Sequence, residues 1–199
     1  MPIHLPQVRL GIPMLLSAAE WSVFALYWSA AAKNASPVKS AESRPSRRVH
    51  ELLVNLALLL VVFPVPGLPG RRFLPGGPYP ACAGLCIQTA SGLLGVWARR
   101  HLGRYWSGEI AIKVDHRLIR SGPYRFVRHP IYTAMLGMFA GTAVVSGQLH
   151  AAAGLAMAGF AYWRKIRLEE ANLRKAFGPA YDAYRRETGS LVPRLLKVG

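Results

Sequence analysis

Residues 131–163 read IYTAMLGMFAGTAVVSGQLHAAAGLAMAGFAYW, and none of these positions is Asp, Glu, Lys or Arg. A helix that spans a bilayer needs ~20 apolar residues at a rise of 1.5 Å each, so this block is too long for one span. It contains one tight polar break, Ser146-Gly147-Gln148. The stretch therefore predicts two short helices that form a hairpin across a membrane.

Three more apolar blocks lie upstream of this hairpin. Residues 12–32 carry a single charge, Glu20, and residues 52–66 and 79–98 carry none. Block 52–66 is short and ends among prolines, so we expect a tilted, kinked or extended span there. Together the blocks predict an all-α fold: an integral membrane bundle of about five transmembrane helices with a C-terminal cytoplasmic helical segment.

The positively charged residues test this count. The chain of 199 residues is 52% apolar, yet its net charge is +16. If successive loops alternate between two sides of a membrane, 22 Lys and Arg lie on one side and 3 on the other. Lys and Arg concentrate in cytoplasmic loops, so we predict a multi-pass protein with its N-terminus outside and its C-terminus and active site in the cytoplasm. The rich side comprises residues 33–51, 99–130 and 164–199, and the poor side comprises residues 1–11 and 67–78.

The same topology explains the basic composition. Lys and Arg next to a membrane attract anionic lipid headgroups. Nucleic-acid binding would instead need a basic patch on a folded soluble face. We therefore expect membrane lipids as partners and no nucleic acid.

Two features of the apolar blocks have ordinary structural explanations. Ala30-Ala31-Ala32 resembles a signal-peptide cleavage site, but the preceding run is longer than a signal sequence and contains Glu20, so we expect a retained helix. Cys82 and Cys86 lie four apart on one helical face, where a disulfide would be strained. We interpret both cysteines as small packing residues and assign no metal site.

The chain divides into two parts of different character. Residues 1–98 hold the first three transmembrane helices, with a polar loop at 37–48 and a Gly/Pro-rich, non-helical loop at 67–80. Residues 99–199 form the candidate functional core, which contains the transmembrane hairpin 131–163 and cytoplasmic C-terminal helices.

The end of the chain has clear helix signals. Between Gly159 and Gly178, residues 160–177 contain neither Gly nor Pro, and Pro179 follows Gly178. Gly followed by Pro is a typical helix stop. We therefore expect one helix that leaves the membrane and ends near residue 177, then a short helix over residues 180–187.

The first chemically dense motif is Gly122-Pro123-Tyr124-Arg125-Phe126-Val127-Arg128-His129-Pro130-Ile131-Tyr132. Pro130 suits the first turn of a helix, whose free N–H groups and positive dipole end favour a carboxylate. The Arg and His side chains add donors, and the Tyr and Phe side chains add aromatic faces. An interfacial belt of Arg and Tyr is the structural alternative.

The second motif is Arg167-Leu168-Glu169-Glu170. Helical spacing puts Glu170 on an apolar face with Ile166, Leu173 and Phe177. A carboxylate there needs a partner, so we interpret Glu170 as a fixed anion that faces a cationic ligand group. A surface helix with a pair from Glu170 to Arg174 is the alternative, and this alternative suits Glu169 better.

One ligand would satisfy both motifs. S-adenosylmethionine has a carboxylate for the helix start, an ammonium for Glu169 or Glu170, and an adenine for aromatic or backbone groups. Both motifs are predicted on the cytoplasmic side, so a single site is geometrically possible.

The motifs also resemble those of a known family. The segment 122–132, then Glu169-Glu170-Ala171-Asn172-Leu173, then Phe177-Gly178-Pro179-Ala180-Tyr181-Asp182-Ala183-Tyr184 and Pro193 looks like the isoprenylcysteine carboxyl methyltransferase family, which is related to phospholipid N-methyltransferases. Leu102-Gly103-Arg104-Tyr105-Trp106-Ser107 resembles the segment that leads into this core in bacterial members. The resemblance covers roughly residues 99–195.

This resemblance implies a membrane methyltransferase that binds S-adenosylmethionine without a Rossmann domain, between the His-Pro helix and the Glu-Glu helix. By position, the implied cofactor-lining residues are Tyr124, Val127, Arg128, His129, Tyr132, Glu169 and Glu170. Eukaryotic members have a longer acidic run and an Arg before the Glu pair. Here the sequence is Lys165-Ile166-Arg167-Leu168, which leaves the substrate-facing group open.

Methyl transfer is an in-line displacement, for which the protein aligns the nucleophile and excludes water. A carboxylate acceptor needs no base, whereas an amine or thiol needs one, for which Glu170 and His129 are candidates. Arg164 and Arg167 are candidates to orient an acidic acceptor. Trp106 suits either a lateral substrate entrance or an interfacial anchor.

We therefore expect an S-adenosylmethionine-dependent methyltransferase that acts on a lipophilic or membrane-associated small acceptor. One rival is an NADPH-dependent membrane reductase of the sterol reductase type, whose Arg-Asp and Cys pattern is replaced here by Glu-Glu and Phe-Gly. The other is a non-enzymatic membrane carrier. Glu20 is a functional candidate within the first span or a residue that pairs inside the bundle.

Overall fold

The computed structural model describes residues 11–33, 38–41, 43–63, 70–106, 111–113 and 118–194. Within these ranges there are six α-helices, two short 3-10 helices and two short strands. The α-helices are α1 (Ile12–Ala32), α2 (Arg44–Val62), α3 (Pro78–Leu102), α4 (Pro130–Ser146), α5 (Leu149–Phe177) and α6 (Pro179–Glu187).

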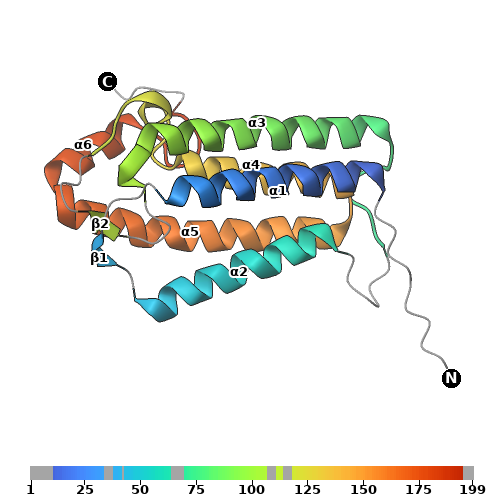
Figure 1. Ribbon diagram of the computed structural model, residues 1–199, viewed down its shortest axis with the longest axis horizontal. Coiled ribbons are helices and arrows are strands. Elements are labelled where there is room, and N and C mark those ends of the chain that lie inside the picture. Colours follow the sequence, from blue (N-terminus) through green and yellow to red (C-terminus); the bar gives the residue numbers. More distant parts are fainter. Residues whose placement is uncertain are drawn as a thin grey trace.

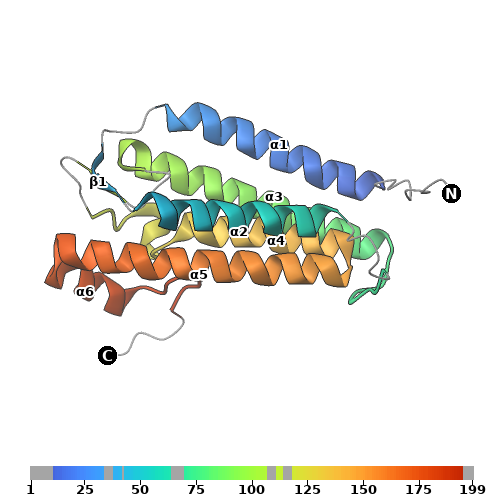
Figure 2. The same cartoon turned by 90° about the horizontal axis from the view of Figure 1, so that it is seen from below.

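Five of the helices lie side by side along the long axis of the molecule, and successive ones run in opposite directions (Figure 1). Helix α3 packs along α4, α2 packs along α5, and α1 rests on α3 and α4. Helix α5 continues past the start of α4, and α6 folds back against its end (Figure 2). One end of the bundle therefore carries α6, the strands and the 3-10 helices, and in the described part of the chain the other end carries the turn between α4 and α5 and the residues that precede α3.

The helix boundaries confirm the hairpin that the sequence predicted. Helix α4 begins at Pro130, and the chain turns between α4 and α5 at Gly147, whose φ of 64° lies in the left-handed region. Helix α5 ends at Phe177, and Gly178, at φ 51°, leads directly into α6. Glycine adopts this conformation without the steric cost that other residues meet.

Two loop predictions were wrong. The segment predicted as a polar loop at residues 37–48 contains β1 (Val38–Ala41), which pairs antiparallel with β2 (Ala111–Lys113), and the first turn of α2. The Gly/Pro-rich segment 67–80 was predicted to be non-helical, but α3 begins at Pro78 because proline is well tolerated at the first helical position.

Glycines allow the central helices to approach closely. A Cβ atom on Gly84 of α3 would lie 2.6 Å from the carbonyl oxygen of Gly141 on α4, and the reverse contact is equally short. On the other side of the bundle, a Cβ on Gly154 would lie 2.6 Å from Val61 Cγ2. Small residues at helix crossings are typical of membrane bundles, in which packing rather than the hydrophobic effect holds helices together.

A buried polar cluster ties α1, α3 and α4 together. Ser17 Oγ donates to Gln88 Oε1 at 2.6 Å, Gln88 Nε2 donates to the Ser17 carbonyl at 2.8 Å, and Thr142 Oγ1 donates to Gln88 Oε1 at 3.0 Å. All three side chains are fully buried. Trp21 Nε1 adds a bond to Thr142 Oγ1 at 3.0 Å. Each such bond between membrane helices contributes on the order of 0.6 kcal/mol.

The one acidic residue of α1 has a hydrogen-bond partner on α3 for one of its two carboxylate oxygens, while Oε2 has none among the described residues. Thr89 Oγ1 on α3 donates to Glu20 Oε1 at 2.8 Å. This is the pairing that the sequence left open as the alternative to a functional role, so Glu20 takes part in holding α1 against α3.

The outer surface of the bundle is apolar. Exposed side chains on the outer faces of α1, α2 and α5 include Leu26, Leu59, Phe160 and Trp163, each more than half exposed. Among the described residues, α3 is the helix whose length and composition suffice to cross a membrane, and α4 is apolar but shorter. Cys82 and Cys86, predicted to pack inside the bundle, are exposed on α3.

Candidate active site

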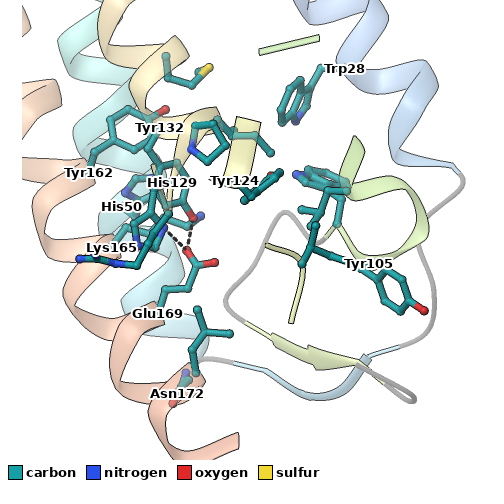
Figure 3. Close-up of a pocket in the computed structure, with 18 of the residues that line it drawn as sticks. Trp28, His50, Tyr105, Tyr124, His129, Tyr132, Tyr162, Lys165, Glu169 and Asn172 are labelled. Atoms are coloured by element: carbon teal, nitrogen blue, oxygen red, sulfur yellow. Dashed lines mark hydrogen bonds and ion pairs between the residues drawn. The ribbon is translucent and has the colours of Figure 1, made fainter. Parts of the chain in front are cut away.

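A cavity of about 420 Å³ opens at the end of the bundle that carries α6 (Figure 3). Its walls come from all six α-helices, with Leu102 as the contribution of α3, and from the 3-10 segments that precede α4. The two halves of its lining differ in character. Aromatic and aliphatic side chains of α1 and α4 line one half, and polar side chains of α4, α5 and α6 line the other.

Glu169 presents a carboxylate to the polar half. Tyr132, one turn into α4, donates its hydroxyl to Glu169 Oε2 at 2.7 Å, and His129 Nδ1 lies 3.8 Å from the same oxygen. The His129 and Tyr132 rings stack with centroids 5.5 Å apart. The Glu169 side chain is 31% exposed and lines the cavity (Figure 3). The two sequence motifs therefore meet, as the sequence predicted.

Glu170 has a different environment from its neighbour. Its Oε1 accepts from Arg128 Nε at 2.8 Å and lies 3.3 Å from His129 Nε2. Its Oε2 lies 3.3 Å from Arg185 Nε, which forms an ion pair without hydrogen-bond geometry. Burial alone would raise the pKa of Glu170, but the bonds from His129 and Arg128 outweigh it and lower that pKa to about 2.

These contacts change the interpretation of the two carboxylates. The sequence placed Glu170 opposite a cationic ligand group and assigned both carboxylates to cofactor binding, although a surface pair suited Glu169 better than Glu170. In the structure, Glu170 is held by two arginines and a histidine of the protein and is not part of the cavity lining. The predicted surface partner Arg174 instead pairs with Asp182 at 3.0 Å. Glu169 is the carboxylate that a ligand would meet.

The segment after α6 closes around the start of α4. The backbone N–H of Arg128 donates to the Gly189 carbonyl at 2.9 Å, and that of His129 donates to the Ser190 carbonyl at 3.1 Å. Thr133 Oγ1 donates to the Leu191 carbonyl at 2.7 Å. Arg128 also donates to the Thr188 carbonyl. We call residues 188–191 the C-terminal clasp.

The clasp limits which donors the helix start offers. The N–H groups of Arg128 and His129 are occupied, and Pro130 has none. The next two residues, Ile131 and Tyr132, lie in the first helical turn, whose N–H groups have no intrahelical acceptor, and α4 has no side-chain cap. Both residues line the cavity. This leaves the backbone N–H groups of Ile131 and Tyr132 as the expected hydrogen-bond donors to a ligand at the start of α4.

Two further residues implied by the resemblance, Tyr124 and Val127, occupy the 3-10 segment before α4. Tyr124 lines the cavity, and its carbonyl accepts a bond from Tyr184 Oη at 2.5 Å. Burial raises the pKa of Tyr124, so it remains a neutral phenol. Val127 is buried, pairs through its backbone with Gly189 and does not line the cavity.

The cations after the membrane part of α5 divide between the surface and the cavity. Arg164 donates to Ser46 Oγ at 2.9 Å and to the Ser46 carbonyl at 3.2 Å, and Arg167 is exposed to solvent. The structure does not bring either arginine to the cavity. Lys165 lies between them, is 9% exposed and lines the cavity one helical turn before Glu169.

The apolar half of the cavity was not anticipated. Trp21, Phe24 and Trp28 line it from α1, with Met135 from α4. Trp106, a residue singled out in the sequence, lines it too and stacks under the Arg99 guanidinium at 4.4 Å. The spacing of the three α1 aromatics, three and four residues apart, is a helical stripe, so the sequence did contain a signal for this wall.

Comparison with known proteins finds a match over the part of the chain that holds much of this site. Residues 84–175, from the middle of α3 to near the end of α5, match the model of the isoprenylcysteine carboxyl methyltransferase family. This segment contains His129, Tyr132, Glu169 and Glu170. It does not include α1 or α2.

Three curated relatives cover parts of the chain. Over 106 residues the chain is 36% identical to the cobalt-zinc-cadmium resistance protein CzcN of Cupriavidus metallidurans and 34% identical to the nickel-cobalt-cadmium resistance protein NccN of Alcaligenes xylosoxydans xylosoxydans; each match covers 52% of this chain and 48% or 49% of the relative. Over 80 residues it is 31% identical to the protein-S-isoprenylcysteine O-methyltransferase of Schizosaccharomyces pombe, which covers 40% of this chain and 34% of that protein. The matches therefore span half or less of each relative's length.

A solved structure shares the fold over most of the chain. It is the eukaryotic intramembrane Ras methyltransferase, an isoprenylcysteine carboxyl methyltransferase, with a TM-score of 0.52 and 19% sequence identity. The match covers 94% of this chain and 54% of that one. The part of the chain that brings His129 and Glu169 together at the cavity, residues 84–175, therefore resembles the isoprenylcysteine carboxyl methyltransferase family.

Proposed function

We propose that the chain is an integral membrane methyltransferase that uses S-adenosylmethionine and acts on a lipophilic or membrane-associated small acceptor. One observation carries this proposal. A single cavity joins a polar half around Glu169 to an aromatic half on α1. A charged methyl donor and an apolar acceptor would thus meet in one enclosed space.

The polar half fits the donor group by group. The Glu169 carboxylate suits an ammonium group, and the uncapped N–H groups of Ile131 and Tyr132, with the Arg128 guanidinium nearby, suit a carboxylate. Tyr124 and Tyr184 offer aromatic faces for a base. The cavity volume of about 420 Å³ lies within the range of small-molecule sites. The cofactor would supply a methyl group already activated on a sulfonium.

The protein would contribute position and protection from water. Glu170 holds Arg128 and His129 in place, and the His129 ring stacks on Tyr132, which orients Glu169. An aligned donor and acceptor react far faster than free ones, because the entropy of bringing them together has already been lost. Of the three neighbouring cations Arg164, Lys165 and Arg167, only Lys165 lines the cavity.

The membrane location rests on three features that agree. The exposed belt of α1, α2 and α5 is apolar, as a surface that faces lipid would be. Five helices alternate in direction, which matches the 22-to-3 division of Lys and Arg between two sides. The proposed spans are residues 12–32, 52–62, 79–98, 131–146 and 149–163, with the cavity at the cytoplasmic end.

Calorimetry on the purified protein in detergent tests this function. We expect saturable binding of S-adenosylmethionine and at least 10-fold weaker binding by Glu169→Gln, which keeps an acceptor for Tyr132 but removes the charge that attracts an ammonium. The matched control is Glu187→Gln, because Glu187 forms an exposed pair with Arg120. Binding of NADPH in place of S-adenosylmethionine, or equal affinities for the two variants, would refute the proposal.

A further inference from the structure

His50 lies in the cavity wall but outside the segment that matches the family model. It belongs to α2, and residues 84–175 begin later in the chain. Its side chain is buried at 8% exposure, and its ring meets the edge of Tyr162 with centroids 5.3 Å apart. It lines the same cavity as Lys165 and Glu169 (Figure 3).

The hydrogen bond of His50 fixes which of its nitrogens faces a ligand. Nδ1 lies 3.3 Å from the carbonyl oxygen of Ala161 on α5. A carbonyl only accepts, so Nδ1 carries the proton and Nε2 carries a lone pair. Among the residues that the structure describes, Nε2 has no hydrogen-bond partner. His50 therefore offers an acceptor, not a donor, to whatever occupies the cavity.

The charged groups around His50 keep the ring neutral. Burial and the positive charge of Lys165 lower the pKa of His50 to about 4; Arg164 acts in the same direction, and the Ala161 bond and Glu51 oppose it only in part. The remaining group against the ring is the phenol of Tyr162. At neutral pH the Nε2 lone pair is thus available.

Lys165 restricts the chemistry of the partner that meets this lone pair. Ala161, Lys165 and Glu169 follow one another at intervals of four along the face of α5 that meets the cavity. An ammonium would be repelled by the Lys165 charge. An ionised carboxylate has no proton to donate, so its oxygen lone pairs would be repelled by the lone pair of Nε2. A neutral group that carries a proton and becomes an anion on losing it satisfies both side chains.

We propose that His50 accepts the hydrogen bond of the methyl acceptor at its attacking atom, and that this acceptor is a phenol or thiol on an apolar body. The inference rests on the proposed function, and it departs from the carboxyl group in the name of the family. His50 fixes the direction of the acceptor's lone pair, and Lys165 stabilises the negative charge that develops as the proton leaves.

The proposed step balances in atoms and charge. The acceptor's O or S forms a bond to the methyl carbon, the carbon–sulfonium bond breaks and its electron pair stays on that sulfur. The acceptor proton moves to His50 Nε2 and then to water. The sulfonium loses its positive charge as the imidazolium forms, so the total charge in the cavity stays the same. Because the repulsion between these two positive charges disappears during methyl transfer, His50 can accept a proton at that moment.

Two substitutions separate the two roles of His50. His50→Asn places an amide N–H where Nδ1 was, which retains a donor to the Ala161 carbonyl but removes the lone pair from the cavity. His50→Gln places an amide oxygen near the former Nε2 position, which retains an acceptor but takes up no proton. The control is His150→Asn: His150 Nδ1 bonds the Leu60 carbonyl at 2.6 Å across the same two helices, away from the cavity.

Binding without cofactor is the first readout. The probes are an alkylated phenol and its methyl ether with the same tail. Their binding is measured by the quenching of the fluorescence of the cavity tryptophans. We expect the wild type and His150→Asn to bind the phenol about 10-fold more tightly than the ether, because one hydrogen bond differs. His50→Asn should bind both equally, and His50→Gln should keep most of the preference.

Turnover with labelled S-adenosylmethionine is the second readout. We expect His50→Gln to lower kcat by about 100-fold with little change in KM, since it binds the acceptor but takes no proton. An unchanged phenol preference in His50→Asn, or faster methylation of the matched carboxylic acid than of the phenol and thiol, would overturn the inference. Failure to bind S-adenosylmethionine would instead overturn the proposed function, which calorimetry on the same preparation reports separately.

Discussion

The two ends of the bundle hold α4 by similar backbone hydrogen bonds, but they differ in how completely their polar side chains are hydrogen-bonded. At the end away from the cavity, Phe73 N donates to the Gly147 carbonyl at 2.9 Å and Leu149 N donates to the Arg71 carbonyl at 2.8 Å. At the cavity end, Arg128 and His129 bond the C-terminal clasp through their backbones. Both ends of α4 are therefore closed by backbone bonds from a distant segment.

The two histidines that join α2 and α5 show how the ends differ. His150 uses both nitrogens, Nδ1 to the Leu60 carbonyl and Nε2 to Gln148 Oε1 at 2.9 Å. His50 uses only Nδ1 among the described residues. A polar side chain whose hydrogen bonds are complete serves the fold, and one that keeps a free lone pair in a cavity is available for a ligand. The predictions below test this difference between the ends.

The largest expected difference concerns two arginines. Arg128→Ala leaves the Glu170 carboxylate buried without its closest cation, and breaking a buried pair costs about 3–5 kcal/mol. Arg72→Ala at the other end removes one exposed bond to the Leu74 carbonyl, for which we expect about 1 kcal/mol or less. Chemical unfolding in detergent measures both. Equal losses of unfolding free energy in the two variants would show that the arginines at the two ends contribute equally to stability.

Acid should weaken the cavity end selectively. The native pKa of Glu170 is about 2, below its ordinary value of 4.5. Its ionised form therefore contributes stability that is complete above pH 4.5 and is lost as the pH falls from there towards 2. We expect Glu170→Gln to flatten the unfolding free energy over this window. The effect should be smaller than that of Arg128→Ala, because the glutamine still accepts from Arg128. A wild-type curve without slope there would contradict the assignment.

Two glycines provide a matched pair for ligand binding. Gly122 and Gly147 both have φ near 60°, and a Cβ on either would contact a side chain, His101 or Arg72. Each change to Ala should cost about 1–2 kcal/mol, because the left-handed conformation is strained for other residues. Only Gly122→Ala should also weaken S-adenosylmethionine binding, since Gly122 opens the segment that carries Tyr124. Calorimetry separates the two, and weaker binding by Gly147→Ala would break the comparison.

The smallest expected effect concerns the clasp itself. Thr133→Val keeps the shape of the side chain but removes the bond to the Leu191 carbonyl, at a cost of about 1 kcal/mol. Hydrogen exchange should then increase at residues 188–191 and remain unchanged at the connection around Gly147. Uniform exchange changes at both ends would mean that the clasp has no local role.

The sequence predicted the helix boundaries well where punctuation residues mark them. Pro130, Gly147 and Gly178-Pro179 set the limits of α4 and α5, because each residue restricts or permits one backbone conformation. The pairing of β1 with β2 was missed, since these strands are three or four residues long and some 70 positions apart. Short strands contain too few residues to show a hydrophobic period.

The sequence predicted which motifs form the site, but it did not predict which side chains face the cavity and which face the protein interior. Glu169 and Glu170 were both predicted as cofactor-binding residues near His129, but helical periodicity alone does not locate the arginine that Glu170 meets, so the sequence did not distinguish their environments. His50 could not be identified from the sequence, since its proposed role depends on a cavity to which five other helices contribute. Lys165 had a detectable signal, its spacing of four from Glu169.

The clasp has a consequence for synthesis. The start of α4 is made about 60 residues before its partners at 189–191, so it acquires these bonds only after the last part of the chain has left the ribosome. The polar pocket would therefore be finished only at the end of synthesis, after the earlier helices have formed. Translation that stops shortly after α6 should release a stable bundle that is unable to hold the methyl donor.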